Sequence, residues 1–156
     1  MATKVRTGDV RVEGLAELSR VLKRMDSDLA KELRKANKDA AQVAATVSKS
    51  RALSVGGVAA KVAPTIRASA GVKSASVGFG GAQAPMAGGA EFGANRDRLR
   101  QRSTGTYVGY RQFQPWRGSG RNAGYFVYPA IRDNENRIVE QYTDALDHLL
   151  RRTFPD

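Results

Sequence analysis

The chain has 156 residues, with 26 Lys and Arg residues against 15 Asp and Glu residues, and its formal net charge at pH 7 is +11. It contains no cysteine, which excludes a disulfide framework and any metal site built on cysteine ligands. A chain of this length is expected to form one domain with a buried core, and its basic charge favours acidic protein surfaces or nucleic acid as partners. No apolar signal core follows the N-terminus, and no run approaches the roughly 18 apolar residues of a membrane span. We therefore expect a soluble protein that is not secreted by a signal peptide and makes no contact with a membrane.

Residues 15–47 predict the longest helical region, because apolar residues recur there at every third or fourth position. These residues are Leu15, Leu18, Leu22, Met25, Leu29, Leu33, Ala36, Ala40, Val43 and Val47. Ser27 can accept a hydrogen bond from the first free N–H groups of a new helix, so a kink is expected near residues 26–27. We predict helices over about residues 13–25 and 27–50 that share one apolar face. The opposite face is basic, which fits either a solvated surface or an acidic partner.

The middle of the chain predicts a β-hairpin, because the period of the apolar residues changes from helical to alternating. Residues 54–60 are small and predict a flexible turn out of the long helix. From Ile66 onward apolar residues alternate with polar or small ones, which predicts strands over about residues 63–72 and 75–80 with one face on the helices. Residues 85–92 then favour a short helical turn that starts at a proline.

Residues 94–124 differ in composition from the rest of the chain. They hold seven arginines against one acid, Asp97, and four aromatic rings that include the only tryptophan, Trp116. Thirty-one residues are long for a plain connection within a compact domain, and loops of such length are often binding loops. We predict an extended Arg/aromatic loop that is mobile in the isolated chain and becomes ordered on a partner. Its predicted interface residues are Arg96, Arg98, Arg100, Arg102, Tyr107, Tyr110, Phe113, Trp116 and Arg117.

The residues of this loop are compatible with three interpretations. Arginine and aromatic side chains are enriched at protein interfaces, and the same side chains bind single-stranded nucleic acid through phosphates and stacked bases. No RNP, KH or zinc-finger pattern accompanies the loop, so charge alone indicates nucleic-acid binding. A solvated loop is the third interpretation, and residues 106–110 favour a short strand within it.

The end of the chain predicts a short strand followed by an amphipathic helix. Residues 125–128 are a run of β-favouring side chains that Pro129 terminates. The apolar residues that follow at helical spacing are Ile131, Ile138, Val139, Tyr142, Ala145, Leu146, Leu149 and Leu150. The elements together predict an α+β fold for a single domain, residues 1–156. A long N-terminal helix kinked near residues 26–27 and a C-terminal helix pack on a small antiparallel β-sheet, with residues 94–124 inserted as a long loop.

Residue types that carry catalysis or bind metals are sparse. His148, the only histidine, stands beside Asp147 near the end of the predicted C-terminal helix, which is typical of a surface residue rather than a general base. No Cys/His cluster and no calcium-binding spacing is present. Residues 78–81 are glycine-rich but lack the Gly-Lys-Ser/Thr of a phosphate-binding loop, and this pattern is typical of a strand end. We therefore expect no enzymatic activity, no cofactor and no bound metal.

The order of several short motifs along the chain is distinctive. The motifs are Val12-Glu13-Gly14-Leu15-Ala16-Glu17-Leu18 at the start of a basic helix, Val77-Gly78-Phe79-Gly80 at the end of the hairpin, Pro85 with Glu91-Phe92-Gly93, and Tyr125-Phe126-Val127-Tyr128-Pro129-Ala130-Ile131 before the closing helix. Over roughly residues 12–151 this order resembles that of the minor tail or tail-completion proteins of long-tailed bacteriophages, which sit in the neck between head and tail. Met86 stands where that family commonly has an aromatic residue, and the insertion before Pro115 is long.

The resemblance implies an α+β subunit whose small antiparallel sheet packs against the long helix. It also implies a structural virion protein that forms a homo-oligomeric ring, with a hexamer favoured, between the head connector and the tail tube or tail terminator. Such a ring completes the tail, joins it to the head and leaves a channel in which DNA is a transient contact. The protein would reside in the neck of the virion after assembly in the host cytoplasm. The alternative that the residues themselves favour is a small basic nucleic-acid-binding protein.

Overall fold

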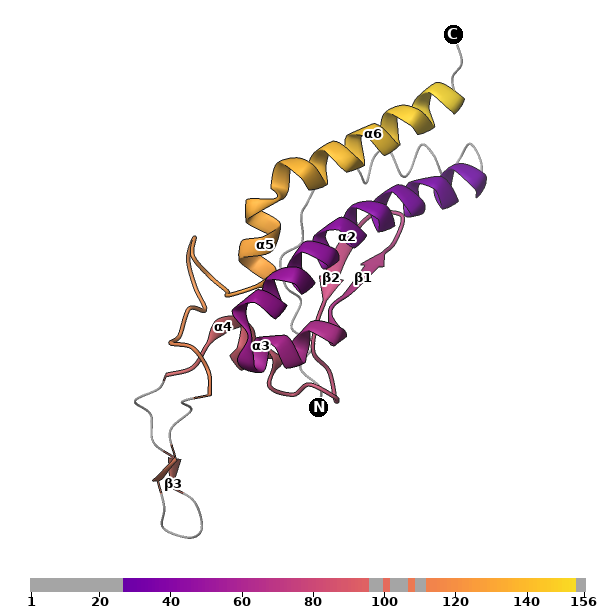
Figure 1. Cartoon of the computed structure of the whole chain (residues 1–156). Coiled ribbons are helices and arrows are strands. Elements are labelled where there is room, and N and C mark those ends of the chain that lie inside the picture. The colour runs from indigo at the N-terminus through magenta and orange to yellow at the C-terminus, as the bar shows by residue number, and fades with distance from the viewer. Residues whose placement is uncertain (1–26, 96–99, 102–106, 109–111, 154–156) are drawn as a thin grey trace.

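The computed structural model describes residues 27–95, 100–101, 107–108 and 112–153 (Figure 1). The elements in chain order are α2 (Ser27–Val55), α3 (Gly57–Val62), the 3-10 helix η1 (Ala63–Thr65), β1 (Arg67–Ala70), β2 (Ala75–Gly78), α4 (Ala87–Phe92), β3 (Arg100–Gln101), β4 (Tyr107–Val108), α5 (Val127–Asp133) and α6 (Glu135–Thr153). The fold is α+β, as predicted: a long helix and C-terminal helices accompany a small antiparallel sheet. The helix predicted over residues 13–25 and the kink near residues 26–27 lie outside the described residues.

Helix α2 is the element on which the others pack. Its apolar face is buried along its length, and Leu33 has no exposed surface. The buried residues of this face are Leu29, Leu33, Ala36, Ala40, Ala41, Ala44, Ala45 and Ala52. Most of them are alanines, whose small side chains let neighbouring elements approach the helix axis closely. The predicted apolar face is therefore confirmed for the described part of the helix, which continues to Val55 rather than ending near residue 50.

The long helix does end within residues 54–60, but the flexible turn expected over this whole stretch is not found, because Gly56 alone separates two helices. Helix α2 ends at Val55, the φ of 75° and ψ of −167° at Gly56 suit only glycine, and α3 begins at Gly57. The helix is stable there because Ala59 and Val62 are buried in the main core cluster. Within this run the small side chain of Ala59 is therefore a core position, which composition alone does not distinguish from a flexible turn.

The hairpin of β1 and β2 confirms the alternating pattern, although both strands are shorter than predicted. Ala68 pairs with Val77, and the N–H of Gly71 donates to the carbonyl oxygen of Ser74 at 2.8 Å to close the turn. The buried Asn37 of α2 donates its side-chain amide to the carbonyl oxygens of Gly71 (2.8 Å) and Val72 (3.1 Å). The hairpin is therefore fastened to α2 by hydrogen bonds as well as by its apolar face. Residues 63–65, which were predicted to begin the first strand, form η1 instead.

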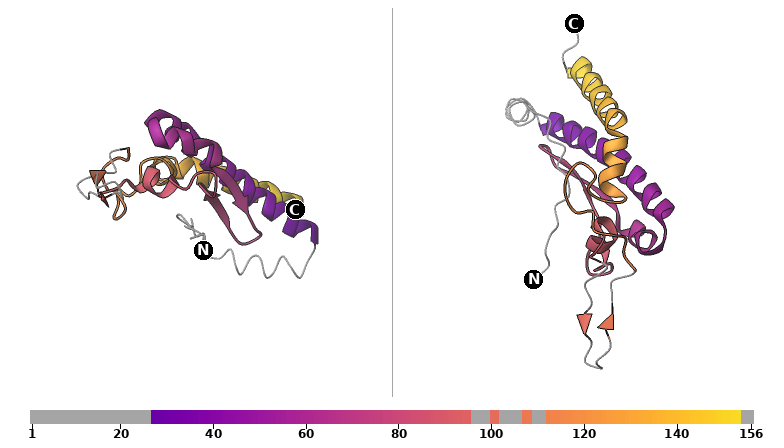
Figure 2. Two further views of the ribbon diagram at one scale, coloured as in Figure 1. Left: turned by 90° about the horizontal axis from the view of Figure 1, so that it is seen from below. Right: turned by 90° about the vertical axis from the view of Figure 1, so that its left-hand side faces the viewer.

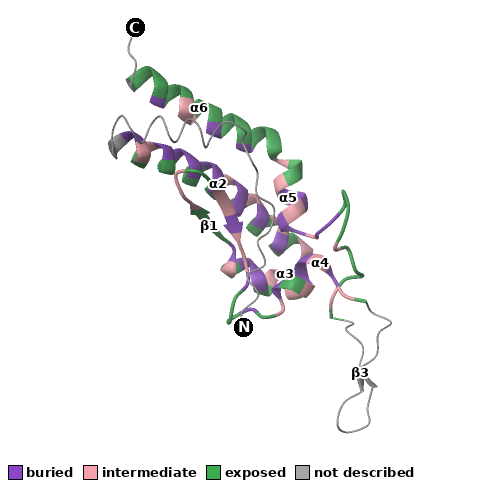
Figure 3. Ribbon diagram, turned by 180° about the vertical axis from the view of Figure 1, so that it is seen from behind, coloured by how far each residue is buried: buried purple, intermediate pink, exposed green. Residues whose placement is uncertain are grey.

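Helix α6 runs antiparallel to α2 and covers it (Figures 1 and 2). An ion pair between Arg152 and Glu32 at 3.0 Å joins α6 to the start of α2, and Arg51 near the end of α2 pairs with Asp133, the last residue of α5 (Val127–Asp133). Ile138, Tyr142 and Leu149 are buried between them. Two residues of the predicted apolar stripe, Val139 and Leu150, are exposed instead, and exposed residues cover much of the outer side of α6 (Figure 3). Among the described helices, none has the length and apolar character needed to cross a membrane.

Candidate interaction site

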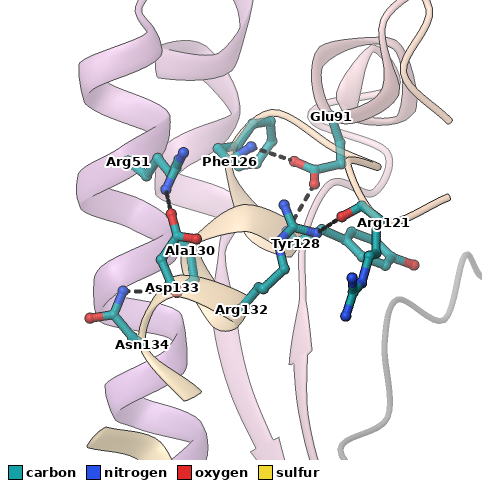
Figure 4. A network of polar contacts seen from close by, with 9 residues as sticks. All are labelled: Arg51, Glu91, Arg121, Phe126, Tyr128, Ala130, Arg132, Asp133 and Asn134. Atoms are coloured by element: carbon teal, nitrogen blue, oxygen red, sulfur yellow. Dashed lines mark hydrogen bonds and ion pairs between the residues drawn. The ribbon is translucent and has the colours of Figure 1, made fainter. Parts of the chain in front are cut away.

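A buried carboxylate organises the region where residues 94–124 join the body. Glu91, near the end of α4, has no exposed surface. Its Oε2 accepts the N–H groups of Phe126 (3.1 Å) and Val127 (2.9 Å), and its Oε1 accepts that of Tyr128 (3.0 Å) (Figure 4). These are the donors at the start of α5 that have no partner within a helix. Glu91 therefore caps α5 from a helix more than thirty residues earlier in the chain.

The strand predicted over residues 125–128 is wrong, and the cap gives the reason. Helix α5 begins at Val127 and contains Pro129 in its first turn, where a proline loses no helical hydrogen bond. The N–H of Ala130 then donates to the carbonyl oxygen of Phe126 at 3.1 Å and continues the helix. Local β propensity was overridden by a tertiary contact that satisfies the helix start.

Burial also sets the charge properties of this carboxyl. Loss of solvent raises the pKa of Glu91 above its ordinary value, and the backbone N–H groups of residues 125–128 offset part of the rise because they stabilise the ionised form. Gly124, with a φ of +80°, brings the chain so close that a β-carbon there would overlap Glu91 Oε1. The sequence analysis did not predict this role for Glu91. The one indication in the sequence is that Glu91 is the single acid in an otherwise small and apolar run from Pro85 to Gly93.

The two ends of the long segment are held together beside α4. The N–H of Ala94 donates to the carbonyl oxygen of Gln114 at 2.9 Å, and the N–H of Arg117 donates to that of Phe92 at 2.6 Å. Between them, Gly93 packs against the backbone of Pro115, and a β-carbon at Gly93 would overlap the Pro115 carbonyl oxygen. This clamp holds the chain on the two sides of residues 96–111 together at one place beside α4.

Side chains at and next to the clamp also pack on the body. The ring of Phe113 lies over Gly89, where an added β-carbon would come within 2.8 Å of it. Phe92 contacts the rings of Trp116 and Tyr128, with centroid distances of 6.5 and 5.4 Å. The Arg117 guanidinium stacks over Tyr125 at 4.6 Å.

Beyond Trp116, the last part of the segment is fastened to α5 and to the clamp. The Tyr125 hydroxyl donates to the Pro115 carbonyl oxygen at 2.7 Å, and the N–H of Gly124 donates to that of Arg117 at 2.8 Å. The Arg132 side chain of α5 donates to the Arg121 carbonyl oxygen (Figure 4).

The segment therefore divides into two parts, which we name the arm (residues 96–111) and the anchor (residues 112–124). The anchor packs on the body. The expectation that all of residues 94–124 form a loop apart from the core is therefore wrong for residues 112–124. Among the predicted interface residues, Phe113 is half-buried in the anchor, Arg117 is exposed over Tyr125, and Trp116 is 63% exposed. Arg100 lies in β3 and Tyr107 in β4. The four others, Arg96, Arg98, Arg102 and Tyr110, lie outside the described residues.

The described strands of the arm form a short antiparallel ladder away from the body. Arg100 pairs with Val108, and Gln101 pairs with Tyr107. Figures 1 and 2 place this ladder beyond α4, at the end of the molecule opposite the C-terminus of α6. A strand predicted within residues 106–110 is thus found at Tyr107–Val108, together with a partner strand that the sequence did not indicate.

The clamp predicts a large difference between two glycines of equal backbone conformation. Gly93 and Gly56 have the same φ of 75° and nearly the same ψ, but an added β-carbon at Gly56 meets nothing within 4 Å. Both alanine variants carry the strain of that conformation, about 1–3 kcal/mol. Gly93→Ala should lose at least about 2 kcal/mol more free energy of unfolding than Gly56→Ala, because the anchor must move away from α4. Urea denaturation of the two variants measures this difference, and equal losses would contradict the clamp.

Within the described ranges, no three His, Asp or Glu side chains gather closely enough to hold a metal ion, and His148 is exposed on α6. The described part of the site is a closely packed base, made of α4, α5 and the anchor, from which a basic arm leaves the body.

Comparison of the chain with protein-family models, with curated proteins and with solved structures finds no match.

Proposed function

We propose that this chain is a structural virion protein of a tailed bacteriophage, a subunit of a ring at the joint between head and tail. Two features support the proposal. The order of its motifs resembles that of tail-completion proteins, and the architecture that this resemblance implies, a small antiparallel sheet on a long helix, is the architecture of the chain. In this role the ring completes the tail, holds the joint together and leaves a channel for DNA.

The observation that carries the proposal is the arm on its clamped base. A segment that served only to connect α4 to α5 would not need a ladder beyond the body, nor a base closed by the bonds of Ala94 and Arg117. Five arginines against one acid in residues 96–111 give this arm a strong positive charge. Such a projecting, charged element suits contact with another macromolecule.

A ring gives the arm a partner in every subunit. When an element at one end of a molecule binds a different surface of the next copy, the contact is heterologous, and it closes into a ring if the rotation allows. Six copies are the favoured number, and the head connector on one side and the tail tube or tail terminator on the other are the favoured neighbours. The protein would then be found in the neck of the virion, after assembly in the host cytoplasm.

Replacing the arm tests the proposal without disturbing the body. A Gly/Ser linker in place of residues 96–111 should leave the thermal unfolding transition within a few degrees of wild type, because the clamp and the anchor are retained. The variant should remain monomeric at concentrations at which the wild-type chain assembles, as measured by analytical ultracentrifugation. A variant with Lys73 and Ser74 of the exposed β1–β2 turn both replaced by glycine serves as the control and should assemble normally. Unchanged assembly of the linker variant would contradict the proposal.

The charge of the chain also predicts a weak interaction with DNA. We expect modest, sequence-independent binding that mostly disappears by about 0.2 M salt, because counterion release is then its only driving force. Fluorescence anisotropy with two unrelated duplexes over a salt series measures it. Tight binding that survives this salt concentration, or a clear sequence preference, would favour a nucleic-acid-binding protein over a virion subunit.

A further inference from the structure

Three exposed arginines come together where the anchor meets α5. Arg117 and Arg121 belong to the anchor, and Arg132 belongs to α5. The N–H of Gly124 donates to the Arg117 carbonyl oxygen at 2.8 Å, which closes the residues between them into a turn that carries Arg121. The Arg132 side chain donates to the Arg121 carbonyl oxygen (Figure 4). These contacts hold the three arginines close together, although they come from two segments of the chain.

No acid lies within this part of the chain. Residues 112–132 contain neither Asp nor Glu. The next residue, Asp133, pairs with Arg51 of α2, and Glu91 is fully buried as the cap of α5. Among the residues that the structure describes, no carboxylate forms an ion pair with any of the three arginines. Their positive charges are therefore available to an anionic ligand.

An aromatic ring orients one of the three guanidinium groups. The Arg117 guanidinium stacks over the Tyr125 ring at 4.6 Å, and the Tyr125 hydroxyl donates to the Pro115 carbonyl oxygen at 2.7 Å. A guanidinium that stacks on a ring keeps the N–H groups at its edge free, and these can donate in pairs to the oxygens of a phosphate or a carboxylate. Arg117 is thus oriented for an anion before any ligand binds.

Trp116 places a supported aromatic ring next to Arg117. Its side chain is 63% exposed, yet the Phe92 ring lies 6.5 Å away between centroids, and a β-carbon added at Gly118 would come within 2.0 Å of the indole. The ring is therefore supported by its own segment and by α4 while part of it stays open to solvent. Such a ring loses little conformational freedom when a flat ligand stacks on it.

The composition of this surface suits a strand of nucleic acid better than a protein. Protein interfaces centre on several apolar side chains and carry their charges at the rim. Among the described residues, the large apolar side chains that are exposed are Leu53, Trp116, Val139 and Leu150, and only Trp116 lies in the anchor. One open ring beside several cations is the pattern of surfaces that bind single strands, where cations contact phosphates and rings stack on unpaired bases. A duplex would offer this surface its phosphates alone, because its bases are paired.

We propose that Trp116, Arg117, Arg121 and Arg132 form a binding site for single-stranded nucleic acid. An unpaired base stacks on Trp116, and the arginines bind the neighbouring phosphates. The site recognises phosphates and an unpaired base, which DNA and RNA share. It goes beyond the proposed ring function and does not depend on it, since every residue of the site belongs to one chain.

The fluorescence of Trp116 reports on the site directly, because it is the only tryptophan of the chain. The probes are a thymidine and a uridine oligonucleotide of about 12 nucleotides and a DNA duplex of the same length, each added to the 156-residue chain. At about 0.05 M salt the single strands should quench this fluorescence and bind at least about fivefold more tightly than the duplex, because stacking adds to the attraction of charge. The tighter of the two single strands identifies DNA or RNA as the source of the ligand.

Two variants at Trp116 separate stacking from charge. Trp116→Ala leaves the net charge unchanged, so it should lose the preference for single strands while the dependence of affinity on salt stays the same. Trp116→Phe keeps a ring and should retain part of the preference. Fluorescence anisotropy of labelled oligonucleotides measures both affinities, and circular dichroism confirms that each variant is folded.

A matched pair of arginine variants tests the phosphate contacts. Arg117→Gln should weaken the binding of single strands at least about threefold and lower the slope of log affinity against log salt by about 0.7. Arg34→Gln removes the same charge from an exposed position of α2, which begins at the end of the molecule opposite α4, and should change the affinity by less than about twofold (Figure 1).

Three results would overturn the site. The first is equal binding of single strands and duplex without quenching of Trp116. The second is an equal loss of affinity in Arg117→Gln and Arg34→Gln, since net charge alone would then account for binding. The third is loss of subunit assembly in Trp116→Ala with unchanged binding of single strands, which would make the surface a protein interface. None of these results decides the ring itself, which the assembly of the wild-type chain tests separately.

Discussion

Replacing Leu33 with aspartate is expected to unfold the chain. Leu33 has no exposed surface and forms a cluster with Leu29 and Leu149 that joins α2 to α6. The variant would bury an unpaired carboxylate in place of an apolar side chain, at a cost of about 4 kcal/mol or more. Because small domains have a total stability of about 5–15 kcal/mol, little or no cooperative transition should remain at room temperature. Thermal unfolding followed by circular dichroism measures the loss.

The same helix provides a matched control. Leu53 is 59% exposed on α2, so Leu53→Asp introduces the same side chain where water can solvate it. That variant should change the free energy of unfolding by about 0.5 kcal/mol or less. If the two variants were equally stable, the apolar face of α2 would not be the centre of the core.

Replacing Glu91 is also expected to have a large effect on stability. Alanine at this position removes the acceptor of the N–H groups of Phe126, Val127 and Tyr128, which are buried or half-buried. A buried donor without a partner costs about 1–3 kcal/mol, so Glu91→Ala should lose about 3 kcal/mol or more of the free energy of unfolding. Glu91→Gln keeps one oxygen for two donors and turns an amide toward the third, and its loss should be about 1–3 kcal/mol.

Urea denaturation of both variants measures these losses. Hydrogen exchange adds a readout specific to the cap, since the amides of residues 126–128 should lose protection before those of α2. An alanine variant as stable as wild type would show that water replaces the carboxylate and that Glu91 does not hold α5 in place.

The pH dependence of stability gives a separate test of the burial of Glu91. Burial raises the pKa of this carboxyl, so the folded chain holds its proton to a higher pH than the unfolded chain. The stability that the protonated carboxyl contributes is present below the unfolded pKa and is lost as the pH rises through the folded pKa. The stability of wild type minus that of Glu91→Gln should therefore fall from about pH 4 upward and then level off. A difference that grows over this range would mean that the N–H donors outweigh burial.

Periodicity of apolar residues predicted much of the described fold. The face of α2 that includes Leu33, the hairpin around Val77 and the buried side of α6 all follow from spacing in short windows of sequence. Each of these elements buries one face, and the residues on that face must be apolar. The spacing of apolar residues therefore follows the repeat of the helix or strand. Val139 and Leu150 share the spacing of α6 but are exposed, because spacing marks apolar positions without showing which neighbour covers them.

The site itself depended on contacts that no local window contains. Residues 125–128 have the composition of a strand and become the start of α5 because Glu91 accepts their N–H groups from far along the chain. The anchor looked like part of a loop because polar residues and Pro115 flank Phe113 and Trp116 without a helical or alternating period. Its packing requires Gly89 and Gly93 of a distant segment to lie beneath it. The basic character of the arm, in contrast, could be predicted from the sequence, because it follows from the number of arginines and not from any contact.

The mass of the 156-residue chain in solution tests the proposed ring most directly. Native mass spectrometry over a concentration series should find one closed oligomer, with six copies of the 16.8 kDa chain favoured, and electron microscopy of the same sample should show rings with a central opening. The arm-replaced chain should give only the monomer under the same conditions. A wild-type chain that stays monomeric throughout the series, or that forms only open filaments, would contradict the assignment of this protein to a ring at the head–tail joint.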